Sequence, residues 1–97
     1  MMRAYRETLL EAARALVADG DLNMRLSQVA CVLIQLDDSD VPPRALEAFE
    51  SVRDPLIAKP LVVGGRLAPR DFDEVEGLRL ARALNDLVLA ELGGLVR

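Results

Sequence analysis

Hydrophobic residues recur at alternating spacings of three and four in four segments of the chain, which is the period of an amphipathic α-helix. Turn signals separate the segments at Asp19-Gly20-Asp21, from Asp37 to Pro43 and from Lys59 to Arg70. The pattern predicts helices over roughly residues 2–18, 22–37, 43–54 and 72–92. We therefore expect an all-α fold, a compact bundle of about four helices that forms a single domain over residues 1–97.

A short turn joins the first two predicted helices. Gly20 suits the left-handed position that ends a helix, and the Asp21 side chain suits the cap that begins the next. Within Val29–Ile34 apolar residues lie nearly all the way round the second helix, so this helix is expected to be the most enclosed. A buried strand over these six residues is an alternative. The buried faces are expected to hold Met2, Tyr5, Leu9, Ala12 and Leu16, and Leu22, Leu26, Val29, Leu33 and Leu36.

Prolines set the expected limits of the third helix. Pro43 is acceptable in a first helical turn, whereas Pro55 lacks an amide donor and clashes with the preceding turn, so we expect the helix to end or kink at Asp54. Its buried face is expected to hold Leu46, Phe49, Val52 and either Leu56 or Ile57.

The segment over residues 59–70 lacks helical periodicity and is expected to be an ordered loop. A hairpin turning at Gly64-Gly65 is the alternative, but its arms are short. After this segment, Asp71 with Glu74 three residues later predicts a helix cap with a capping-box partner. The loop residues expected to pack on the bundle are Leu61, Val63 and Leu67.

The last predicted helix carries an apolar face that covers about half of its circumference or more. Such a helix is either the centre of the bundle or in contact with another chain. Asn85 and Glu91 lie near or inside this face, where a polar residue can fix the register of a contact. The sequence therefore predicts a candidate interface made of Leu78, Leu84, Asn85, Val88, Leu89, Glu91, Leu92 and Leu95.

Composition removes most familiar active-site chemistry, because the chain has no His and one Cys. We expect no catalytic residue, no metal and no cofactor, and Cys31 is interpreted as a small buried hydrophobe. The net charge of −4 disfavours nucleic acid as a partner. The longest apolar run, Val29–Ile34, is six residues, against the roughly 20 of a membrane-spanning helix, so no membrane association is expected.

Three places could still carry chemistry, and each has a simpler structural interpretation. The acidic turn from Asp37 to Asp40 lacks the ligand spacing of a calcium loop and suits a solvated turn. The acidic residues from Asp71 to Glu76 suit a helix N-terminus. The Gly64-Gly65-Arg66 stretch could hold an anion, but it has none of the other residues of a phosphate-binding loop.

These features favour a non-enzymatic, bacterial, cytoplasmic protein that acts by protein-protein interaction, as an adaptor, regulator, immunity-like protein or accessory subunit. The expected partner is a second copy of the chain, as in a homodimer, or another protein. The alternative is a small DNA-associated regulator of helix-turn-helix type, although its reading helix would carry only Arg25 as a base. A third class, an enzyme that uses only carboxylates and Arg, would require a polar pocket.

Overall fold

A computed structural model describes the backbone of residues 4–96 and the side chains of residues 4–92. It confirms the predicted all-α bundle, with one small two-stranded hairpin added. Two 3-10 turns, at Asp38–Asp40 and Pro43–Ala45, connect the second and third helices. The elements are α1 (Tyr5–Leu16), α2 (Leu22–Leu33), α3 (Leu46–Ile57), β1 (Val62–Val63), β2 (Arg66–Leu67) and α4 (Glu74–Val96).

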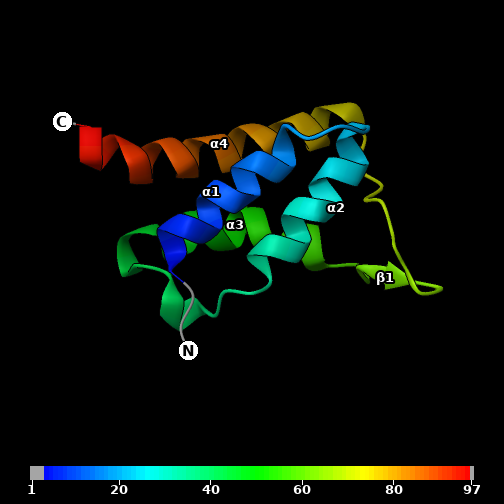
Figure 1. The fold of residues 1–97 in the computed structure, drawn as a ribbon, viewed down its shortest axis with the longest axis horizontal. Helices are drawn as coiled ribbons and strands as arrows, with labels where there is room; N and C mark the ends of the chain where they lie inside the picture. The colour runs from blue at the N-terminus through cyan, green and yellow to red at the C-terminus, as the bar shows by residue number, and fades with distance from the viewer. Residues whose placement is uncertain (1–3, 97) are drawn as a thin grey trace.

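The longest helix, α4, runs along the long axis of a molecule that measures 42 × 29 × 22 Å (Figure 1). Helices α1 and α2 form a helical hairpin with the most extensive contact in the fold, and α4 packs chiefly on α1 and α3. The β-hairpin projects from the end of the bundle where α4 begins. No helix in the described part of the chain combines the length and hydrophobicity needed to cross a membrane.

Phe49 of α3 is completely buried in the core, where the ring of Tyr5 meets it edge-on with centroids 6.2 Å apart. Most of the expected core positions are confirmed, while Met2 lies outside the described residues. Among the side chains that the structure describes, the buried hydrophobic residues are Tyr5, Leu9, Ala12, Leu26, Val29, Ala30, Leu33, Leu36, Val41, Phe49, Val52, Leu56, Leu80, Leu84, Leu87 and Val88.

The connection between α1 and α2 follows the prediction closely. Gly20 has φ +114°, a conformation that only glycine adopts without strain, and the Asp21 side chain accepts a hydrogen bond from the Met24 amide at 2.9 Å. Helix α2 ends at Leu33 rather than at residue 37, and Ile34 is exposed. The strand alternative is therefore wrong, and the expected enclosure of α2 is incomplete, since Cys31 is also partly exposed.

The sequence predicts that the third helix ends or kinks at Asp54, and an end at Asp54 is wrong, because α3 continues to Ile57. Pro55 lies in the last turn of the helix, so its missing amide removes a single hydrogen bond, the one to the carbonyl of the exposed Ser51. Water can reach a carbonyl in that position. The helix therefore tolerates the proline at low cost.

The segment over residues 59–70 contains the hairpin rather than a loop. Gly64 and Gly65 have φ +61° and +77°, which matches the type I′ turn that joins two strands with two residues. Val63 pairs with Arg66 in the antiparallel ladder and is exposed, so the expectation that it packs on the bundle is wrong. Leu61 is partly buried against the core, as expected.

Candidate protein-interaction surface on α4

Helix α4 begins at Glu74 because Asp73 caps it. The Asp73 Oδ1 atom accepts a hydrogen bond from the Glu76 amide at 2.8 Å. The predicted cap at Asp71 is therefore wrong, and the predicted start at residue 72 is two residues early. Asp71 instead forms an ion pair with Lys59, and the hydrogen bond from that ammonium group lowers the pKa of the Asp71 carboxyl.

One side of α4 packs in the hydrophobic core of the chain. Leu80, Leu84, Leu87 and Val88 are all buried there. Near the start of the helix, a Cβ atom built on Gly77 would lie 3.0 Å from Cδ2 of Leu22, so α4 approaches α2 closely at this point. These contacts fix the rotation of α4 about its axis and determine which side chains face outward.

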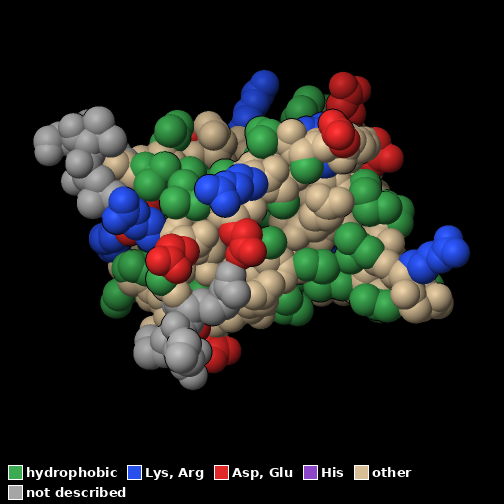
Figure 2. Space-filling model, viewed as in Figure 1, with side chains coloured by type: hydrophobic (Ala, Val, Ile, Leu, Met, Phe, Trp, Pro, Cys, Tyr) green, Lys and Arg blue, Asp and Glu red, His purple; other side chains and the backbone are tan. Residues whose placement is uncertain are grey.

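The opposite side of α4 leaves large hydrophobic side chains uncovered. Val75, Leu78 and Leu89 are 79%, 42% and 59% exposed. The upper edge of the molecule in Figure 2, where α4 lies, shows hydrophobic patches on both sides of a projecting basic side chain. We define the α4 outer face as Val75, Leu78, Arg79, Arg82, Asn85, Asp86 and Leu89.

The α4 outer face has the spacing of a helix contact. Val75, Arg82 and Leu89 follow one another at intervals of seven residues, and such a row drifts by only about 20° per interval around a straight helix. A shallow hollow with a volume of about 600 Å³ lies along the part of this face between Val75 and Asp86. A second groove, between α3 and α4, adjoins it at Ala83 and Asp86.

The predicted interface residues do not share one surface in the structure. Leu78, Asn85 and Leu89 lie on the α4 outer face. Leu84 and Val88 are buried in the chain's own core, so they are not available to a partner on this surface. Leu92 is partly buried against the same core, and the side chain of Leu95 lies outside the described residues.

Glu91 also contacts another part of the same chain and is not on the α4 outer face. Its carboxylate accepts a hydrogen bond from Arg44 Nη2 at 3.0 Å. Burial raises the pKa of the nearby Tyr5 hydroxyl, with a smaller contribution from the negative charge of Glu91. Glu91 therefore connects α4 to the segment before α3 rather than to the outer face.

Some charged side chains of the α4 outer face form ion pairs within the chain and others do not. Arg79 pairs with Glu76, and the hydrogen bond lowers the pKa of the Glu76 carboxyl. Arg82 and Asp86 have no ion-pair partner among residues 4–92. The middle of this face therefore presents one basic and one acidic side chain, four residues apart, to solvent.

The acidic segments are explained by local structure. Asp37 and Asp40 form a reciprocal capping box around the 3-10 turn, and Asp38 accepts a hydrogen bond from Arg53 at 2.6 Å. Asp71 and Glu76 are engaged by Lys59 and Arg79, as described above. No group of three metal-ligating side chains is present within the part of the chain that the structure describes.

Sequence reasoning missed a buried cation in the segment that precedes α4. Arg70 is 6% exposed, and its guanidinium donates hydrogen bonds to four carbonyls, including that of Leu56 at 2.8 Å. The Asn23 side-chain amide donates a hydrogen bond to the Phe72 carbonyl and accepts one from the Phe72 amide, each at 3.0 Å. Arg70 follows a proline outside any helical repeat, so no periodic signal marks it as buried.

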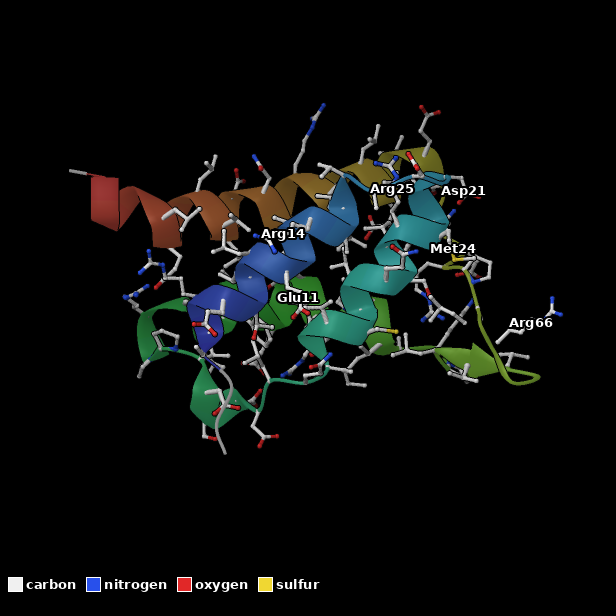
Figure 3. All side chains as sticks on the ribbon, viewed as in Figure 1. Glu11, Arg14, Asp21, Met24, Arg25 and Arg66 are labelled. Atoms are coloured by element: carbon white, nitrogen blue, oxygen red, sulfur yellow. The ribbon has the colours of Figure 1, made fainter. Side chains whose placement is uncertain are left out.

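The basic side chain of α2, the predicted reading helix of the helix-turn-helix alternative, has a role within the fold. Arg25, the single base of α2, donates a hydrogen bond to the Leu16 carbonyl at 2.8 Å and so completes the end of α1 (Figure 3). Figure 3 also shows Arg66 alone at the tip of the β-hairpin, while Arg14 and Glu11 share the outer side of α1. The Arg25 guanidinium is therefore engaged within the fold.

No family model, curated protein or solved structure matches the chain.

Proposed function

We propose that the chain is a non-enzymatic protein-protein interaction module and that the α4 outer face is its contact surface. The observation that carries this proposal is the exposure of Val75, Leu78 and Leu89 on one side of α4, next to polar and charged side chains. Exposed apolar patches with a polar border are typical of protein interfaces. The adjoining groove between α3 and α4 adds hydrophobic area next to the row.

Site-specific photocrosslinking in living cells tests the proposal. A photoreactive side chain replaces Leu89 in one variant and Val63 in the other. Val63 is a matched control, because it is 61% exposed against 59% for Leu89 but lies on the β-hairpin. Both side chains are outside the core, so both variants should retain the fold, which far-UV circular dichroism checks.

The expected result is a discrete protein adduct from position 89 and none from position 63. The adduct is either a covalent dimer of the chain or a conjugate with another protein, and mass spectrometry distinguishes the two. Equal labelling from both positions, or no adduct from position 89, would overturn the proposal.

A further inference from the structure

We infer that the α4 outer face binds a second copy of the chain, an inference that rests on the proposed function. The two α4 helices run antiparallel about a two-fold axis that passes close to the midpoint of residues 83 and 84. In this arrangement Leu78 meets Leu89 of the second copy, and Arg82 meets Asp86 of the second copy. Each contact occurs twice because of the symmetry.

The positions of these residues along α4 satisfy both contacts at once. In an antiparallel pair, two residues lie level with each other when the symmetry axis passes midway between them. The midpoint of Leu78 and Leu89 and the midpoint of Arg82 and Asp86 differ by half a residue, or about 0.8 Å along the helix. One placement of the axis therefore aligns the hydrophobic and the charged pairs.

The rotation of the residues around α4 is also consistent with this pairing. A two-fold axis perpendicular to both helices keeps each side chain on the same flank of the contact in the two copies. At about 100° per residue, with Arg82 taken as the centre of the face, Leu78 and Leu89 lie to one side of it. Asp86 and Arg79 lie to the other side. Hydrophobic residues thus meet on one side of the contact, and on the other side Asp86 of one copy meets the centrally placed Arg82 of the second copy.

Charge selects the antiparallel arrangement over the parallel one. In a parallel two-fold pair each residue meets its own copy, so Arg82 would face Arg82 and Asp86 would face Asp86. Like charges in contact are destabilising. The antiparallel pair instead gives Arg82 and Asp86, which lack ion partners within residues 4–92, a partner each.

The size of the α4 outer face determines how tightly we expect two copies to associate. The outer face extends over the 15 residues from Val75 to Leu89, about 21 Å of helix. A contact of one helix pair belongs to the small, weak class of interfaces. We therefore expect a monomer-dimer equilibrium with a dissociation constant on the order of 10 µM rather than a permanent dimer.

Sedimentation velocity over a concentration series tests the self-association. The wild-type chain should shift from monomer to dimer across the micromolar range, and Leu89→Asp should remain monomeric at every concentration. Val63→Asp is the control, since it places the same charge at an equally exposed position on the β-hairpin, and it should dimerise like the wild type.

Charge reversal tests the pairing of Arg82 with Asp86. Arg82→Asp alone and Asp86→Arg alone place like charges opposite each other in the dimer, and each should weaken association by about tenfold or more. An equimolar mixture of the two variants should form a heterodimer with near wild-type affinity. Affinity that stays unchanged in the single variants would contradict the assigned ion pairs.

Disulfide trapping tests the orientation, in a background where Ser replaces the single cysteine, Cys31. Antiparallel packing brings position 78 of one copy next to position 89 of the other, within reach of a disulfide. Chains with Leu78→Cys and Leu89→Cys should therefore form a mixed disulfide when combined, and neither should form a dimer efficiently alone. Efficient dimers of Leu78→Cys alone would show parallel packing and overturn the inference.

The two proposals can fail separately. A chain that remains monomeric at high micromolar concentration, but still gives a conjugate with a different protein from position 89, refutes self-association and leaves the interaction surface intact. A chain that gives no adduct from position 89 in cells and remains monomeric in solution refutes both.

Discussion

Replacing the buried Arg70 by Met should be among the most destabilising single changes outside the hydrophobic core. Methionine keeps the apolar stem of the side chain and removes the guanidinium. Four carbonyl oxygens lose a donor, at nitrogen-oxygen distances of 2.7 to 3.3 Å. The consequences differ among the four, because their access to water and to other donors differs.

The Leu56 carbonyl carries most of the cost. It belongs to a completely buried residue in the last turn of α3, and leaving a buried acceptor without a donor costs about 1–3 kcal/mol. Lys59 and Pro60 are exposed, so water can replace their bonds, each at a cost of roughly 0.5–1 kcal/mol. The Ala68 carbonyl keeps its hydrogen bond from the Ser27 hydroxyl.

These contributions amount to a loss of about 3 kcal/mol in the free energy of unfolding. The Arg70 Nε atom has no hydrogen-bond partner, so relief of its burial offsets part of the loss. For a domain of this size the net change corresponds to a decrease in Tm of roughly 10–20 °C. Lys at position 70 should recover only part of the stability, because a single ammonium cannot reach all of the carbonyls.

Urea unfolding followed by circular dichroism at 222 nm measures the change, at a chain concentration below about 1 µM, where we expect the chain to be monomeric. Arg66→Met is the matched control, since Arg66 is an exposed arginine on the same hairpin segment. It should leave the midpoint nearly unchanged. If Arg70→Met shifts the midpoint no more than this control does, the assigned role of the guanidinium is refuted.

Three further changes test the local structure. Asp73→Ala should destabilise the chain by about 1 kcal/mol in urea unfolding, because it removes the cap of α4; an equal loss from Asp71→Ala would contradict the assignment of the cap. Gly20→Ala should cost about 1–2 kcal/mol, although an added Cβ meets no atom within 4 Å, because φ +114° is strained for alanine; unchanged stability would refute this. The carboxyl pKa of Glu76 is lowered by its hydrogen bond from Arg79, so this pair stabilises the fold above the ordinary pKa and the effect is lost as pH falls through the lowered value. NMR titration should show the Glu76 pKa rising in Arg79→Gln, and an unchanged pKa would contradict the pair.

The periodicity of the sequence was sufficient to predict the four helices and most of the core, because each helix buries one face against the others. The ends of the helices are harder to predict from periodicity, since they depend on single capping contacts. Asp71 and Asp73 are both acceptable caps by residue type, and the structure distinguishes them because Asp73 accepts the hydrogen bond from the Glu76 amide while Asp71 pairs with Lys59. Likewise, Pro55 does not end α3, and the hydrogen bond that it removes is the one to the carbonyl of the exposed Ser51.

The β-hairpin illustrates a different limit. Its strands are two residues long, too short for any hydrophobic alternation to show in the sequence. What specifies the turn is the pair Gly64 and Gly65, which supply positive φ at both central positions. The need for positive φ at two consecutive positions, which Gly64 and Gly65 meet, is therefore a better indicator of this hairpin than the hydrophobic pattern of its strands.

The α4 outer face was only partly predictable, for a reason of geometry. A helical wheel shows how wide an apolar face is, but it does not show which part of that face the rest of the chain covers. In the structure the core takes Leu84 and Val88 and leaves Leu78 and Leu89. The close approach of α4 to α2 at Gly77 helps to fix that choice, because a small change in the rotation of α4 would expose different residues. The residues left over are therefore a property of the tertiary packing, and substitutions at Leu78 or Leu89 should alter association while leaving the stability of the fold nearly unchanged.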